Sequence, residues 1–199
     1  MKVHQCWALS VMGAGLLAAV TASAQFNPLT IVGRVVSTAM DVRSKAEVKN
    51  DVEISTAASK RLLDDERAEW RGVTLLVFAQ HVVLAGAVKA ADVKKIVAEV
   101  VRKDARIRSL TNDLIVIKKA GDEGGFVKDT AIDTKIDVAL TAAGGVSSVN
   151  MRWKSVGGNV VLMGVAHSKE EAQLAVAKIK ELDGVTGVKS HLRIVPRPG

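Results

Sequence analysis

The sequence has few of the residues on which small catalytic and metal sites depend. Its 199 residues include one cysteine, no tyrosine and three prolines. The cysteine, Cys6, falls in a stretch that we expect to be removed, which leaves none for thiol chemistry, disulfides or Cys-ligated metals. The motifs G-x-x-x-x-G-K, G-x-G-x-x-G and G-x-S-x-G are absent as well. We therefore expect a protein that is not an enzyme.

Histidine is also scarce. Only His81, His167 and His191 follow the N-terminal stretch, and no two of them stand at the i, i+4 spacing of a helical metal site. The acidic run 64–66 has no second acid or nucleophile placed opposite it by the sequence. We expect no metal and no cofactor.

The N-terminal stretch 1–24 resembles a secretory signal. Lys2 precedes an apolar run over positions 7–20, and small residues follow at 22–24. The run is shorter than the roughly 20 residues needed to span a bilayer, so cleavage after Ala24 is favoured over a membrane anchor. The residues before Cys6 do not match a lipidation motif. Export without disulfides predicts a periplasmic protein, which could lie peripheral to the outer membrane.

Positive charge exceeds negative charge. Without Lys2, 27 lysines and arginines face 21 acids, a net charge of +6. In an exported protein this excess favours anionic lipid headgroups or acidic polymers over nucleic acid.

The chain contains an internal repeat with a constant offset. The segment 81–117 matches 159–195, and the match extends upstream in the same register to Ile54 and Ile132, with eight identities in 64 paired positions. The match rests on the same spacing of apolar residues in both segments, which indicates two copies of one supersecondary unit.

The apolar spacing predicts the same elements in each copy. In the first copy we expect a helix over 48–63, strands over 73–78 and 82–88, a helix from 93 and a last strand over 110–117. In the second copy the hairpin strands are 151–156 and 160–165, and Ser168-x-x-Glu171 is a capping box for its second helix. Three strands cannot enclose a core, so both helices of a unit must cover one sheet face.

These elements give a domain plan. We expect a signal peptide at 1–24, an amphipathic segment at 25–47, a first domain at 48–118, a linker at 119–125 and a second domain at 126–196. The segment 28–40 is either a membrane-surface helix or a cover for the first core.

Basic residues suggest a binding surface. They gather on the second helix of the first copy and flank the first helix of the second copy. A solvated helix face would explain most of them. As a surface for anionic lipid, each would contribute about 1 kcal/mol. The candidate lipid-binding residues are Lys94, Lys95, Arg102, Lys103, Lys128, Thr130 and Lys135.

The repeat resembles the BON domain. The middle strand shows Val-x-Leu-x-Gly at 82–86 and again at 160–164, and the last strand shows Leu-x-Asn-x-Leu-x-Val at 110–116, with Ser190 in place of the asparagine in the second copy. The resemblance implies an α+β fold of two tandem helix-strand-strand-helix-strand sandwiches, each a three-stranded mixed sheet with two helices on one face. It is specific for the fold and less so for function.

The resemblance also implies a function. Exported proteins with two BON domains, similar to the osmotically induced and outer-membrane-maintenance proteins, attach to anionic phospholipid membranes without catalysis, usually through the second domain. We expect such a phospholipid-binding envelope protein, supporting outer-membrane integrity or the envelope stress response. The alternative is a periplasmic stress chaperone or a protein-protein interaction module that contacts other envelope proteins.

Overall fold

A computed structural model describes residues 41–68, 70–117 and 126–197. The expected signal, the segment 28–40 and the linker 119–125 lie outside these ranges. None of the described helices is both long enough and apolar enough to cross a bilayer. The elements, in chain order, are α1 (Lys45–Asp64), β1 (Val73–Phe78), β2 (His81–Val88), α2 (Ala91–Arg102), β3 (Ser109–Asn112), β4 (Ile115–Val116), α3 (Phe126–Ala142), β5 (Met151–Val156), β6 (Asn159–Ala166), α4 (Lys169–Lys180) and β7 (Gly187–Ile194), with 3₁₀ turns Trp70–Gly72 and Ser148–Asn150 before β1 and β5.

The same order of elements occurs twice, in a first unit from α1 to β4 and a second unit from α3 to β7. The offset is the one seen in the sequence, because β2 begins at His81 and β6 begins at its repeat equivalent, Asn159. In each unit the first two strands form an antiparallel hairpin, and the last strand pairs in parallel with the middle one. The result is an α+β protein with four helices and two mixed sheets among the described residues.

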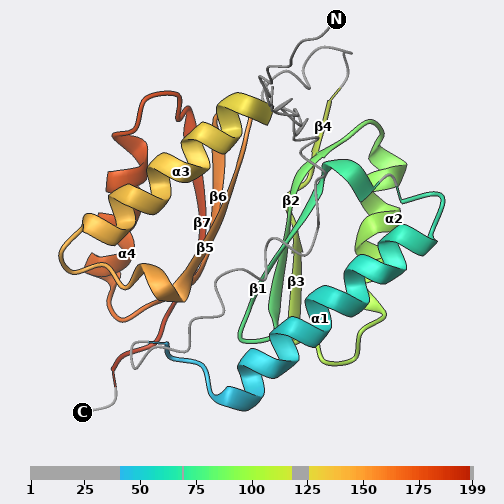
Figure 1. The fold of residues 1–199 in the computed structure, drawn as a ribbon, viewed down its shortest axis with the longest axis horizontal. Coiled ribbons are helices and arrows are strands. Elements are labelled where there is room, and N and C mark those ends of the chain that lie inside the picture. Colours follow the sequence, from blue (N-terminus) through green and yellow to red (C-terminus); the bar gives the residue numbers. More distant parts are fainter. Residues whose placement is uncertain (1–40, 69, 118–125, 198–199) are drawn as a thin grey trace, which may run out of the picture.

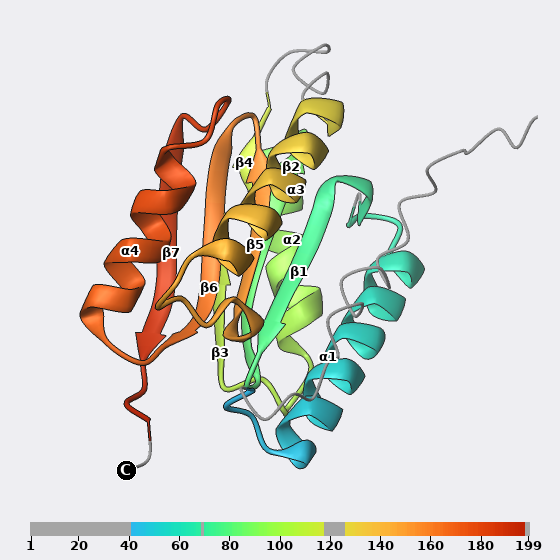
Figure 2. The same ribbon diagram turned by 60° about the vertical axis from the view of Figure 1, so that its left-hand side comes forward.

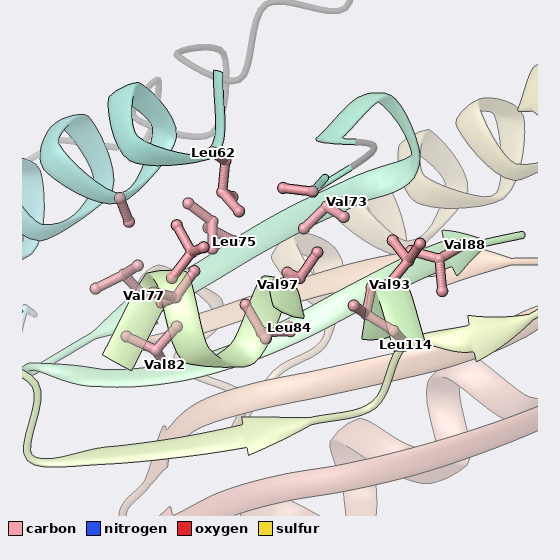
Figure 3. Packing of buried hydrophobic residues seen from close by; sticks show 14 of the residues in the cluster. Leu62, Val73, Leu75, Val77, Val82, Leu84, Val88, Val93, Val97 and Leu114 are labelled. Carbon is pink, nitrogen blue, oxygen red and sulfur yellow. The ribbon is translucent and has the colours of Figure 1, made fainter. Parts of the chain in front are cut away.

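Each unit has its own core between its helices and one face of its sheet. In the first unit, α1 and α2 contribute residues such as Leu62 and Val97, which pack on Leu75 and Leu84 of the hairpin (Figure 3). In the second unit, α3 and α4 pack in the same way on β5, β6 and β7. Alternate strand residues serve this core because successive side chains point to opposite faces.

The other faces of the two sheets pack against each other. Leu76 and Phe78 of β1 and Val83 of β2 form one buried cluster with Val161 and Met163 of β6. This explains why every residue of β1 is buried, since the strand has apolar partners on both faces. The molecule is a stack of helices, sheet, sheet and helices, with α1 and α2 on one outer side and α3 and α4 on the other (Figures 1 and 2).

A helix carboxylate holds each hairpin turn. Asp51 of α1 accepts hydrogen bonds from the backbone N–H groups of Ala79 at 2.8 Å and Gln80 at 2.6 Å. Asp129 of α3, at the equivalent repeat position, accepts from Gly157 at 2.9 Å and Gly158 at 3.1 Å. The shared aspartate was a signal in the repeat that our sequence comparison, beginning at Ile54, did not include.

Two details differ from the sequence-based expectation. The first helix begins at Lys45 rather than 48, because Ser44 forms a reciprocal capping box with Glu47. The last strand of the first unit is not continuous over 110–117. It breaks after Asn112, whose side-chain oxygen accepts a hydrogen bond from the Leu114 N–H at 3.2 Å. That local turn competes with strand pairing.

The capping box expected at the start of α4 is present only in part. The Ser168 hydroxyl accepts a hydrogen bond from the Glu171 N–H at 3.1 Å. The Glu171 carboxylate instead accepts from the backbone N–H groups of Ser147 at 2.7 Å and His167 at 2.8 Å. Glu171 therefore fixes the entry to β5 against the end of β6.

Candidate functional site

The outward side of α3 combines lysines with small or apolar residues and contains no acid. Lys128, Ala131, Lys135, Val138 and Ala142 are all exposed and follow the i, i+3, i+7 spacing of one helix face. Val138 is 65% exposed, more than any other large hydrophobic residue of the described chain. We refer to these five residues, with the exposed Thr134 and Thr141 beside them, as the α3 outer face.

The acids of α3 lie elsewhere on the helix. Asp129 is buried and binds the hairpin turn. Asp133 accepts hydrogen bonds from Lys154 Nζ at 2.6 Å and from the Ser155 N–H at 2.7 Å. Burial raises the pKa of the Asp133 carboxyl, and the Lys154 charge opposes that rise only in part. With Asp137 also half-buried, the α3 outer face is left with positive charge only.

The equivalent face of α1 has charged residues where the α3 outer face has alanine and valine. Glu53, Lys60 and Asp64 of α1 occupy the repeat positions of Ala131, Val138 and Ala142 in α3. On α1 these residues take part in exposed i, i+4 ion pairs, Lys49–Glu53 and Lys60–Asp64, each at 3.8 Å. The second unit thus replaces ion-paired charges with alanine and valine on a surface that faces solvent.

The candidate residues of the second unit are partly brought together. Lys128 and Lys135 belong to the α3 outer face, and Lys135 Nζ also donates to the Asp183 carbonyl at 3.3 Å. Thr130 is exposed as well, and it lies one turn before Thr134, whose hydroxyl donates to the Thr130 carbonyl at 3.0 Å, so it borders the α3 outer face on its threonine side. Sequence reasoning found the two lysines and missed Ala131, Val138 and Ala142. Their replacement of charged residues across the repeat was the available signal.

The candidate residues of the first unit form a separate surface. Lys95 and Arg102 of α2 and Lys103 after it are exposed, whereas Lys94 is half-buried, with its carbonyl bonded by the Asn112 side chain at 2.8 Å. Because α2 and α3 lie on opposite outer sides of the stacked sheets, these residues are not continuous with the α3 outer face (Figure 1).

The neighbouring arginines, Arg106 and Arg108, are not free to bind anions. Arg106 pairs with Asp104 and Glu53, and its bond to Asp104 lowers the pKa of that carboxyl to about 2. Arg108 pairs with Glu47 at 3.1 Å. Part of the positive charge that the sequence gathers here therefore stabilises the first unit.

Trp153 belongs to the core of the second unit. It is partly buried against the core of the second unit, and its indole N–H donates to the Asp133 carbonyl at 3.1 Å. Within the described ranges, no group of three or more His, Cys, Asp or Glu side chains has the geometry to hold a metal ion.

Comparison with known families supports the resemblance seen in the sequence. The family model described as "BON domain" matches residues 128–196, which is the second unit from α3 to the end of β7. Residues 128–196 form a BON domain. The family match covers the α3 outer face and does not extend to the first unit.

A curated relative and two solved structures are also similar to this BON-domain protein. A protein of Anaplasma centrale described as "Uncharacterized protein in gshII 5'region" is 30% identical over 122 residues, covering 61% of this chain and 81% of the relative, and the chain belongs to the same family. Structures of CdsD, a structural protein of the Type III secretion system of Chlamydia trachomatis, and of its C-terminal domain are each 15% identical with a TM-score of 0.31. They cover 73% and 69% of this chain, which spans 64% and 63% of theirs.

Proposed function

We propose that this BON-domain protein is a non-catalytic periplasmic protein that binds anionic phospholipid surfaces through the α3 outer face. The observation that carries the proposal is the contrast between the two units. Where α1 has exposed ion pairs, α3 has Ala131, Val138 and Ala142 between and beyond its two lysines. BON domains are associated with phospholipid binding and with envelope proteins, and the family match includes this helix. In this proposal the first unit is a second BON domain that packs behind the sheet of the membrane-binding unit.

The composition of the face fits the boundary between water and lipid. An amphipathic helix lying in the interface places apolar side chains among the acyl chains and lysines near the headgroups. Val138 would enter the headgroup region, while Lys128 and Lys135 would contact phosphates. The long lysine side chains allow their charges to stay at the level of the headgroups. Such a protein would support outer-membrane integrity or the envelope stress response.

The strength of binding follows from these few groups. Each lysine near an anionic surface contributes about 1 kcal/mol, and full burial of a valine side chain contributes about 1.5–3 kcal/mol. Because α3 places one exposed valine and two lysines on this face, binding should be weak and reversible. It should also weaken as salt screens the lysines.

The proposal is tested by co-sedimentation with vesicles of phosphatidylcholine alone and of phosphatidylcholine mixed with phosphatidylglycerol. The parent protein should sediment with the anionic vesicles at low salt. Val138→Glu should bind them about tenfold or more weakly, since it removes the apolar contact and adds a charge of the same sign as the surface.

Leu63→Glu provides the matched control. Leu63 lies near the end of α1, is 48% exposed and belongs to the opposite outer side of the molecule. Its replacement makes the same change of charge without touching α3, so binding should stay within about twofold of the parent. Equal loss in both variants would show that net charge alone controls binding. Absence of binding by the parent would reject the lipid proposal in favour of a protein partner.

A further inference from the structure

The open edges of the two sheets face each other along β3 and β7. Leu110 of β3 packs on the first core, so the residues on either side of it face the second unit. Val188 and Leu192 of β7 pack on the second core, so the alternate residues of β7 face the first unit. We call this line of facing side chains the seam. Its members are Ser109, Thr111 and Asp113 from the first unit and Lys189, His191 and Arg193 from the second.

One end of the seam is neutralised. Asp113 accepts hydrogen bonds from Lys189 Nζ and from His191 Nε2, each at 2.5 Å. Burial opposes ionisation of Asp113, but these two bonds outweigh it and lower the pKa of its carboxyl. Asp113 lies against Lys189 and His191 of β7, and β3 runs in the opposite direction to β7 (Figures 1 and 2). Ser109, at the start of β3, therefore lies toward the end of β7, where Arg193 is found.

The other end of the seam is positively charged and has no acid available. Arg193 is half-buried, and none of the described residues forms a hydrogen bond or an ion pair with its guanidinium group. Its electrostatic neighbours include Arg108, and burial together with that like charge lowers the pKa of Arg193. His81 stands opposite Ser109 in the pairing of β2 with β3. Burial lowers the pKa of His81, and the charges of Arg193 and Arg108 lower it further.

The two carboxylates whose negative charges act on Arg193, Glu47 and Asp51, are already engaged by other groups. Glu47 pairs with Arg108 at 3.1 Å and closes the capping box at Ser44. Asp51 holds the hairpin turn and pairs with Arg43 at 3.0 Å. A half-buried guanidinium without a counter-ion is costly, and the fold retains one here beside a second arginine.

We propose that Arg193, His81 and Ser109 form a binding site for a phosphate-class anion at the open end of the seam. The guanidinium offers a planar pair of N–H donors that matches two phosphate oxygens. The Ser109 hydroxyl and the His81 Nδ1 atom share a hydrogen bond of 2.6 Å, which orients the imidazole and leaves Nε2 to meet the ligand. Inorganic phosphate and a lipid headgroup present the same oxygens, so either source satisfies this chemistry.

The site is independent of the membrane surface proposed above. Arg193 alternates along β7 with the core-facing Leu192, so its side chain faces the first unit, whereas α3 covers the opposite face of the second sheet (Figure 2). A phosphate titration without vesicles therefore tests the seam alone, and Val138→Glu tests α3 alone. Failure of one result leaves the other intact.

The experiment is a titration of the purified protein with inorganic phosphate, followed by the amide NMR signals of His81, Ser109 and Arg193, against sodium chloride at matched ionic strength. Phosphate should shift these signals saturably and chloride should not. Arg193→Gln should weaken phosphate binding about tenfold or more, as expected for loss of a charge-assisted pair. Lys180→Gln removes the same charge from an exposed position at the end of α4 and should change the affinity by less than twofold.

Stability and vesicle measurements complete the test. Without phosphate, Arg193→Gln should unfold at the same temperature as the parent or higher, because it removes a like charge beside Arg108. If Arg193→Gln also weakens binding to vesicles containing phosphatidylglycerol, the source of the anion is a headgroup; if vesicle binding is unchanged, it is a free phosphate. Equal shifts with chloride, or equal phosphate affinity in Arg193→Gln and the parent, would overturn the site.

Discussion

Replacing Asp51 with asparagine changes few atoms, but it should destabilise the protein strongly. The Asp51 carboxylate is buried and accepts three hydrogen bonds, from the Ala79 N–H at 2.8 Å, the Gln80 N–H at 2.6 Å and Arg43 at 3.0 Å. Ala79 and Gln80 have φ angles of 51° and 64°, in the left-handed region that costs a residue with a side chain about 1–2 kcal/mol. The carboxylate is what holds this turn in place.

The magnitude follows from the bonds that asparagine cannot make. Its amide oxygen can accept from one turn N–H, while its NH₂ group faces the other N–H and leaves it unpaired, at a cost of about 1–3 kcal/mol. Arg43 also loses an ionic partner but keeps Asp41 at 2.6 Å. We expect Asp51→Asn to lower the free energy of unfolding by about 2–4 kcal/mol.

Urea unfolding at pH 7 measures this change, and two other variants calibrate it. Asp129→Asn should cost less, because Asp129 caps the turn Gly157–Gly158, where positive φ angles are not strained. Asp64→Asn should cost less than about 0.5 kcal/mol, because it removes only an exposed i, i+4 pair. A value for Asp51→Asn as small as that for Asp64→Asn would refute the role given to the buried carboxylate.

Two further predictions concern Gly164 of β6 and the seam. Gly164→Ala should lower the free energy of unfolding by at least about 2 kcal/mol. The φ angle of Gly164 is 128°, and the new Cβ would lie 2.1 Å from the Asn150 carbonyl oxygen. Gly144→Ala is the control in the same urea assay, because its new Cβ would have no atom within 4 Å. Asp113→Asn should lower the free energy of unfolding by about 1–3 kcal/mol at pH 7. The pKa of Asp113 is lower in the folded protein than in the unfolded chain, where it is about 3.9. The stability that the Asp113 carboxylate contributes is therefore complete above about pH 3.9 and disappears as pH falls through the folded pKa. Plots of unfolding free energy against pH for the parent and the variant should converge in that acid range. A difference that persists unchanged in that acid range would contradict the assignment.

Much of the fold of each unit could be predicted from the sequence because it rests on local patterns. The hairpin strands follow from β-branched runs, and their turn in the second unit follows from Gly157–Gly158. The helices follow from apolar residues at helical spacing. The constant offset of the repeat then allowed weak signals in one copy to be judged against the other.

The stacking of the two sheets could not be predicted in the same way. It depends on Leu76, Phe78 and Val83 in the first unit meeting Val161 and Met163 in the second, and periodicity within one unit does not identify the partner of a second apolar face. The break at Asn112 was missed although Thr111, Asn112 and Asp113 are polar and include turn-forming residues, because apolar residues on both sides of them suggested one continuous strand. The candidate lipid site was predicted through its lysines, since charge is visible in the sequence, but its apolar members required knowledge of which helix side faces solvent.

The stacked sheets explain how two similar units can present different outer surfaces. Because the inner faces of the two sheets pack together, each unit presents its outer helices, its loops and its open strand edge to solvent. Differences on those surfaces leave the common core untouched, so α1 can have exposed ion pairs where α3 has Ala131 and Val138. The same reasoning applies at the seam: Asp113 of the first unit occupies the repeat position of His191 in the second, and the two now bind each other. The difference between the two copies at this repeat position therefore provides a contact that joins the units, while Arg193, two positions further along, has no counter-ion among the described residues.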